Sequence, residues 1–107
     1  MNNSTKGHNV IAEFSIIPIG TEETSVSQYI SDVIKAFEKV ENLRFEVTPM
    51  GSILEAKSLA TIFQAVESAH QNIIDKGIKR VISTLRIDDR RDKPRTMQDK
   101  VKALKVE

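Results

Sequence analysis

The sequence contains no cysteine, and this absence removes several kinds of chemistry at once. A disulfide framework, a thiolate nucleophile and a thiolate metal site are all excluded. There are only two histidines, His8 and His70, and they are too far apart in the sequence to indicate a metal site. Neither a Ser-His-Asp arrangement nor a Glu-x-x-His spacing is present, so the usual signatures of hydrolases and zinc enzymes are missing.

The chain also lacks a strong charge of either sign and a long apolar run. Lys and Arg number 16 and Asp and Glu number 15, which gives a net charge of +1 and no global attraction to nucleic acid or acidic membranes. No apolar run approaches the roughly 20 residues that span a bilayer. The first eight residues have no signal-peptide core, so we expect residues 1–8 to be a flexible tail of a cytoplasmic protein.

The remaining composition is that of one globular domain. Hydrophobic residues make up 39% of the 107 residues and charged residues 29%. A chain of this size buries roughly 65% of its unfolded surface. Because no low-complexity linker interrupts the sequence, we expect a single domain over residues 9–107.

Alternation of apolar side chains predicts four strands. Residues 9–19 place Val10, Ala12, Phe14 and Ile16 on one face, which a period of two requires. Residues 44–48 and 52–56 flank Pro49-Met50-Gly51 and predict a tight hairpin. Residues 79–88 predict the fourth strand.

Apolar residues at spacings of three and four predict two helices. The first stripe runs from Val26 to Val40, with Ser25 and Gln28 as a capping box and Asn42 as a plausible end. The second stripe runs from Leu59 to Ile74 and includes Phe63, which we expect in the core. Ser58 is a candidate cap for this helix, and Gly77 is placed for a left-handed residue after its end.

The order of the predicted elements gives the fold class. It is β-α-β-β-α-β followed by a short C-terminal helix near Thr96, which is the α+β, ferredoxin-like arrangement. We expect a four-stranded antiparallel sheet with both helices on one face.

The helix-free face of this sheet carries an unusual mixture of side chains. The first, second and fourth strands contribute Glu13, Ser15, Ile17, Glu46, Thr48, Ile82, Thr84, Arg86 and Asp88. The third strand contributes either Ser52 and Leu54 or Ile53 and Glu55, depending on the register after the turn. Glu is depleted in strands, and a buried carboxylate needs a partner. That partner is either Arg86, in a structural ion pair, or a ligand that is cationic or donates hydrogen bonds, and the sequence leaves both open.

Four short segments together resemble a known family. They are Ile17-Pro18-Ile19-Gly20-Thr21, Ser25-Val26-Ser27-Gln28-Tyr29-Ile30, Thr48-Pro49-Met50-Gly51-Ser52-Ile53-Leu54-Glu55 and Ile87-Asp88-Asp89-Arg90. In this order they resemble the small thiamine-binding proteins of the ferredoxin-like class. Two positions depart from the family: Ser52 stands where Thr is expected and keeps the hydroxyl, and Ala56 stands where many members have Gly.

The resemblance implies a homotetramer, a dimer of dimers that covers the open sheet faces. It also implies non-enzymatic binding of thiamine or its hydroxymethylpyrimidine moiety, with no metal or cofactor. Glu55 and Ser52 are the leading candidates for contacts, because a carboxylate accepts from the amino group of the pyrimidine. The other candidate ligand-binding residues are Ser15, Glu13, Thr84 and the apolar Ile17 and Met50.

Three other functions compete with this one. A purely structural assembly protein would use the mixed face only for oligomer contacts. An enzyme acting on a phosphorylated substrate is disfavoured because residues 20–24 are acidic and lack Arg. An RNA-binding sheet is disfavoured because the fourth strand has no aromatic residue. The charged run 88–95 is either a solvated loop or a phosphate-attracting group of Arg90, Arg91, Lys93 and Arg95.

Overall fold

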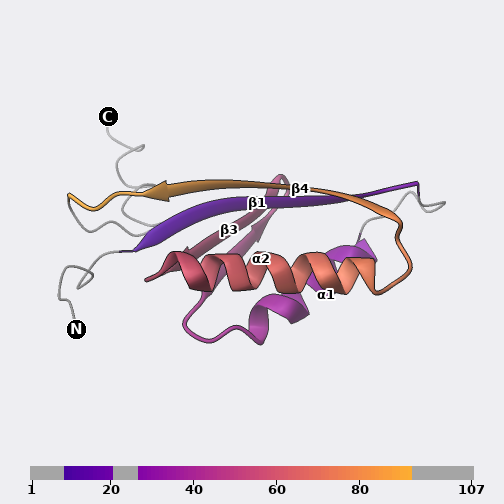
Figure 1. Ribbon diagram of the computed structural model, residues 1–107, viewed down its shortest axis with the longest axis horizontal. Helices are drawn as coiled ribbons and strands as arrows, with labels where there is room; N and C mark the ends of the chain where they lie inside the picture. Colours follow the sequence, from indigo (N-terminus) through magenta and orange to yellow (C-terminus); the bar gives the residue numbers. More distant parts are fainter. Residues whose placement is uncertain (1–8, 21–26, 93–107) are drawn as a thin grey trace.

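The computed structural model describes residues 9–20 and 27–92. Its elements are β1 (Val10–Ile19), α1 (Ser27–Glu38), β2 (Arg44–Thr48), β3 (Gly51–Ala56), α2 (Leu59–Ile74) and β4 (Arg80–Asp89). The strands form one antiparallel sheet in the order β2-β3-β1-β4, and both helices cover the same face (Figure 1). The predicted ferredoxin-like fold is confirmed. The tail at residues 1–8, the capping residue Ser25 and the C-terminal helix lie outside the described residues.

The strand register assigns each side chain to a face of the sheet. Val10, Ala12 and Phe14 of β1 face the helices, together with their β3 partners Ala56, Leu54 and Ser52. The core between sheet and helices consists of these apolar side chains and of Val33, Ala36, Phe37, Val40, Ile62, Ala65, Ala69 and Ile73 from the helical side. Phe14 packs edge-on against Phe37 with ring centroids 6.2 Å apart. Each fully buried Val, Leu, Ile or Phe side chain of this core stabilises the fold by about 1.5–3 kcal/mol.

The capping signals of the second helix behave as predicted. Ser58 is the N-cap of α2, and its hydroxyl accepts a hydrogen bond from the Thr61 N–H at 3.2 Å. Gly77 has a φ of 91°, three residues after the end of the helix at Ile74. A positive φ suits glycine, which has no Cβ to clash. The end of α1 differs from the prediction, because the helix stops at Glu38 and Asn42 adopts a φ of 66° in the connection that follows.

The placement of Phe63 corrects the sequence prediction. Its side chain was expected in the core but is 51% exposed. The α2 residues that point into the core are Ile62, Ala65, Ala69 and Ile73. Phe63 lies beside this stripe, so the apolar face of α2 is wider than the surface that the sheet and α1 cover.

Candidate functional site

The two sides of β1 are paired over different lengths. On one side β4 pairs with the strand from Val10 to Ile19. On the other side β3 pairs with it only from Val10 to Phe14, where Ser52 is the last partner. In the described part of the chain, the segment Ser15–Ile19 therefore has a sheet neighbour on one side only.

The hairpin turn is fixed directly against the point where this pairing stops. Thr48 pairs with Gly51, so the connection is the two-residue loop Pro49-Met50. Gly51 has a φ of 148°, and a Cβ on it would lie 2.9 Å from the carbonyl oxygen of Phe14. Only glycine allows the hairpin to approach the β1 backbone this closely. The close approach holds the tip of the hairpin beside Ser15.

A cavity of about 310 Å³ opens at this place, between the unpaired edge of β1, the first turns of α1 and the tip of the hairpin. We call it the hairpin cavity. Its lining residues are Phe14, Ser15, Ile16, Ile17, Pro18, Tyr29, Ile30, Val33, Val47, Thr48, Pro49, Met50, Gly51 and Ser52. None of these side chains is acidic or basic. The hairpin cavity is therefore an apolar site with a few neutral polar groups, which is the usual composition of a small-molecule pocket.

Exposed apolar side chains gather around the hairpin cavity. Ile17, Ile30, Val47 and Met50 line it and are 53%, 41%, 42% and 82% exposed. They come from β1, α1, β2 and the hairpin turn, so the sequence does not show that they are neighbours. A group of exposed apolar residues from separate elements marks a surface that binds a ligand or a partner.

The neutral polar groups of the cavity have different roles. The Thr48 hydroxyl serves the turn, because it donates to the Gly51 carbonyl at 2.8 Å and accepts from the Met50 N–H at 3.2 Å. Ser52 is buried on the helix side of the sheet, and Ser15 is half-buried on the edge. In an extended strand the N–H and C=O of one residue point to the same side. The edge of β1 therefore offers a donor and an acceptor side by side.

Glu55 lies at the other end of the hairpin. It pairs with Ile11 and Arg44, which places it on the open face, while Ser52 faces the helices. The register after the turn is thus resolved, and Ser52 and Glu55 lie on opposite faces of β3. At a rise of about 3.3 Å per residue, Glu55 is roughly 10 Å along β3 from Ser52.

The surroundings of Glu55 are those of an internal ion pair. Its side chain is 3% exposed, and Oε1 lies 3.4 Å from Nη1 of Arg44. The Asn9 amide donates to Oε2. Of the two partners considered from the sequence, Arg86 is not the one that Glu55 uses, since Arg86 stands opposite Glu13. Glu55 lines a separate polar hollow with Asn42, Lys57 and Ser58.

The structure thus divides the predicted site residues into two groups. Ser52, Ser15, Ile17 and Met50 meet in the hairpin cavity. Glu55, Glu13 and Thr84 do not line it. Glu13 is exposed on the open face, and Thr84 stands opposite Ser15 on the same face.

Several cavity residues were missed by sequence reasoning. Tyr29 was interpreted as packed, and Phe14 and Val33 as core, yet all three line the cavity. Pro18 was the feature of the sequence that could have indicated an unpaired edge at this place. Proline is confined to edge strands, strand ends and bulges, and here β1 continues through Pro18 to Ile19 with only β4 beside it.

The charged segment after β4 pairs within itself. Arg90 donates to both carboxylate oxygens of Asp92 at 2.6 and 3.1 Å, and Arg91 donates to Asp89 at 2.9 Å. The hydrogen bond and the charge of Asp92 raise the pKa of Arg90 above its usual value. These two guanidinium groups therefore already have anionic partners. Lys93 and Arg95 lie outside the described residues.

The described residues contain neither a metal-binding cluster nor a membrane-spanning helix. No cluster of His, Cys, Asp and Glu side chains is arranged to hold a metal ion in the ranges 9–20 and 27–92. Neither of the helices in those ranges is long and apolar enough to cross a membrane.

Comparison with known sequences gives consistent matches over nearly the whole chain. The sequence model of a family described as thiamine-binding proteins matches residues 12–105. A UPF0045 protein of Methanothermobacter thermautotrophicus is 43% identical over 96 residues, which cover 90% of this chain and 96% of the relative. The UPF0045 protein YqgV of Bacillus subtilis is 39% identical over 97 residues, which cover 88% and 92% of the two chains.

Solved structures share the same architecture. Hypothetical protein MJ1052 of Methanocaldococcus jannaschii has a TM-score of 0.81 and 40% identity, with 91% of this chain and 96% of that chain covered. A candidate thiamine biosynthesis or salvage protein of Thermotoga maritima has a TM-score of 0.73 and 20% identity, with coverage of 91% and 99%. At that identity the second likeness shows the fold alone.

Proposed function

Since the chain belongs to the thiamine-binding protein family, we propose that it binds thiamine or the hydroxymethylpyrimidine moiety of thiamine in the hairpin cavity, without chemical conversion. The observation that carries the proposal is the position of an uncharged, largely apolar cavity against an unpaired strand edge. An aminopyrimidine is flat, weakly polar and carries a donor beside an acceptor. Each of these properties matches the cavity.

The edge of β1 recognises the ring in this proposal. A backbone N–H and C=O of the segment Ser15–Pro18 exchange hydrogen bonds with a ring nitrogen and the amino group. The hydroxyl of Ser52 adds a further polar contact. Ile17 and Met50 cover the faces of the ring, and the positive thiazolium remains near solvent, since no charged side chain lines the cavity.

Glu55 has no direct contact with the ligand in this proposal. Its carboxylate lies against Arg44 and accepts from Asn9, and it lines a different hollow, although Oε1 makes no hydrogen bond among the described residues. The sequence suggested a carboxylate as the acceptor for the amino group of the pyrimidine. In this proposal the backbone of β1 takes that role.

The experiment is titration calorimetry of the purified protein with thiamine, hydroxymethylpyrimidine and thiamine phosphate. Ile17→Ser and Ile30→Ser should weaken binding at least about tenfold, because each removes an apolar wall of the cavity. Ile82→Ser is the matched control, since Ile82 is 44% exposed, stands directly opposite Ile17 and does not line the cavity. Glu55→Gln should leave affinity within about twofold in a folded protein.

Each of the other results has a defined meaning. A loss of affinity in Ile82→Ser or Glu55→Gln that equals the loss in Ile17→Ser would move the site to the open face. No binding of any of the three compounds by a folded protein would reject the function and favour the structural assembly role.

The same family membership leads us to propose a homotetramer. The open face supports this with Ile82, which is 44% exposed between Arg80 and Thr84 on the same strand. Stacking two such faces would bury this apolar side chain. Light scattering of the eluting protein gives the mass and tests the proposal.

A further inference from the structure

A second hollow lies at the end of β3 opposite to the hairpin turn, and we call it the Glu55 hollow. It has a volume of about 640 Å³, which is within the usual range of small-molecule sites. Its lining residues are Asn9, Asn42, Leu43, Arg44, Glu55, Ala56, Lys57, Ser58 and Thr61. None of them lines the hairpin cavity, so the two places are separate.

Glu55 is the group of this hollow whose polar contacts are incomplete. Its side chain is 3% exposed, and Oε1 has no hydrogen-bond partner among the described residues. The Arg44 guanidinium lies 3.4 Å from Oε1 without a hydrogen bond, and its side chain is 55% exposed. A buried carboxylate oxygen is costly unless a donor reaches it. Because more than half of Arg44 is in solvent, this side chain can turn away from Oε1 and admit another donor.

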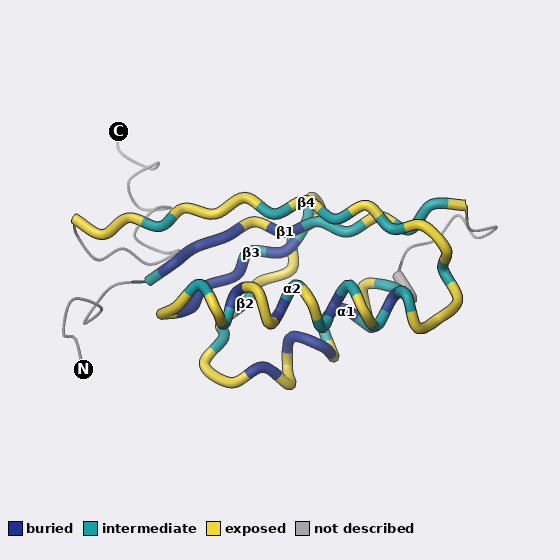
Figure 2. The backbone as a smooth tube through the Cα atoms, in the orientation of Figure 1, coloured by how far each residue is buried: buried dark blue, intermediate teal, exposed yellow. Residues whose placement is uncertain are grey.

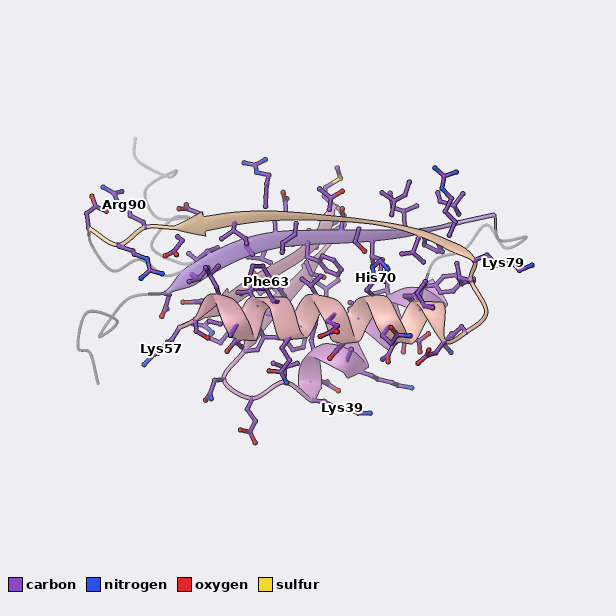
Figure 3. The ribbon with its side chains drawn as sticks, viewed as in Figure 1. Lys39, Lys57, Phe63, His70, Lys79 and Arg90 are labelled. Atoms are coloured by element: carbon purple, nitrogen blue, oxygen red, sulfur yellow. The ribbon has the colours of Figure 1, made fainter. Side chains whose placement is uncertain are left out.

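The rest of the Glu55 hollow favours negative charge. The N-terminus of α2, a helix of 16 residues, reaches it through Ser58 and Thr61. The Ser58 hydroxyl accepts from the Thr61 N–H at 3.2 Å, and the N–H groups that precede Thr61 in the first turn have no acceptor within the helix. Lys57 lies beside this turn (Figure 3). Its ammonium group and the positive end of the helix both attract an anion.

This combination of groups disfavours ligands that carry one kind of charge. A metal ion would meet one carboxylate and two cations, Arg44 and Lys57, which repel it. A plain anion would suit Lys57 and α2, but it would repel Glu55 and leave Oε1 without a donor. A plain cation would suit Glu55 alone. A ligand that matches both parts of the hollow has a positively charged donor at one end and a negative group at the other.

We propose that the Glu55 hollow binds a small zwitterion with a protonated amine and a carboxylate. The amine donates to Oε1 of Glu55 after Arg44 has turned away, and the carboxylate lies against Lys57 and the N-terminus of α2. Glu55 and Lys57 are two residues apart, roughly 6–7 Å in an extended chain, so a molecule longer than an α-amino acid spans them best. This site involves no residue of the hairpin cavity and does not depend on binding there.

The probe for this site is 4-aminobutanoate, in which a short methylene chain separates the amine from the carboxylate. Butylamine and butanoate are the matched controls, because each keeps the carbon chain and only one of the two charged groups. We expect titration of the full chain with 4-aminobutanoate to give saturable NMR shifts of the backbone amides of Lys57, Ser58 and Thr61. Each control should bind at least about tenfold more weakly. Equal binding of either control would refute a site with two charged ends.

Two substitutions test the two ends of the site separately. Glu55→Gln should weaken 4-aminobutanoate binding at least about tenfold, because it removes the charge that holds the amine. Glu13→Gln, at an exposed position of the open face, should leave binding unchanged. Lys57→Ala should weaken binding several-fold, and Lys39→Ala is its control at another exposed lysine. Circular dichroism checks the fold of each variant, and Lys57→Ala keeps the test valid if Glu55→Gln does not fold.

Three other results would overturn the proposal. Shifts confined to Tyr29 and Ile30 would place the zwitterion in the hairpin cavity. Binding that is unchanged in both Glu55→Gln and Lys57→Ala would show that neither side chain contacts it. No saturable shift with 4-aminobutanoate or with glycine, its shorter analogue, would show that the Glu55 hollow does not bind zwitterions.

Discussion

The two halves of β1, Val10–Phe14 and Ser15–Ile19, belong to one continuous strand but differ in burial and in pairing. In Val10–Phe14, all side chains except Glu13 are buried and the backbone is paired on both sides. In Ser15–Ile19 no side chain is buried, and β4 is the only strand neighbour in the part of the chain that the structure describes. Figure 2 shows this change of burial along one continuous strand.

The difference shows that the sequence pattern that forms a strand and the neighbouring elements that bury it are separate requirements. A period of two makes a segment able to form a strand, but burial depends on what the rest of the chain places beside it. In the first half, β3 is the second strand neighbour, and both helices cover Val10, Ala12 and Phe14. In the second half, the cover ends at the hairpin turn, and the exposed strand edge becomes the wall of the hairpin cavity.

The largest expected effect is a difference in stability between substitutions in the two halves of β1. Phe14→Ala should lower the free energy of unfolding by about 3–5 kcal/mol, because it empties a fully buried position against Phe37. Ile17→Ala should lower it by less than about 1 kcal/mol, since half of the side chain is exposed. Urea unfolding followed by circular dichroism gives both values. Equal losses would remove the distinction between the halves.

The boundary between the halves is tested at Gly51. Gly51→Ala should destabilise the protein by about 1–3 kcal/mol, because the positive φ is strained and the new Cβ meets the Phe14 carbonyl. Gly20→Ala is the control, since Gly20 also has a positive φ but no atom within 4 Å of an added Cβ. Thermal unfolding of both variants isolates the effect of the contact. A loss in Gly20→Ala as large as that in Gly51→Ala would mean that the contact does not fix the hairpin.

Substitutions at the Glu55 end of the sheet should change the stability of the protein and not its affinity for the ligand of the hairpin cavity. Arg44→Gln leaves a buried carboxylate without its ion pair and should cost about 1–2 kcal/mol, less than for a fully buried pair because Arg44 is 55% exposed. Adding Glu55→Gln should recover part of this loss, and chemical unfolding of the two single variants and the double variant measures the coupling. Additive losses would show that the two side chains act independently.

The smallest effect on stability is expected at the tip of the hairpin. Met50→Ala should change the free energy of unfolding by less than about 0.5 kcal/mol, because the side chain is 82% exposed. Affinity for thiamine or hydroxymethylpyrimidine should nevertheless fall several-fold in titration calorimetry. Unchanged affinity would exclude Met50 from the ligand contacts.

Much of the fold could be predicted from local chemistry. Alternation identified the strands and, for all but the third strand, their faces. Pro49-Met50-Gly51 identified the hairpin, and Ser58 identified the start of α2. Phe63 was wrongly predicted because helical periodicity gives the width of an apolar stripe and not the width of the surface that covers it. That second width depends on tertiary placement.

The candidate site could be predicted only in part. Ser52 and Ser15 were named, but they were grouped with Glu55, which lies on the other face of β3. The sequence could not show that the cavity is on an edge, because an edge is created by the difference in length between β1 and the hairpin. Tyr29 and Val47 were missed for the same reason, since only the three-dimensional arrangement brings them to that edge.

The short hairpin has a consequence for how this architecture can change. The contact of Gly51 with Phe14 sets the position at which β3, the second strand neighbour of β1, stops. Lengthening both arms of the hairpin by a few residues would extend the sheet over Ser15 and Ile17 and close the cavity, while shortening them would widen it. Insertions at this turn therefore add strand pairing and reduce the cavity, and deletions do the reverse. Neither change alters any residue of the core.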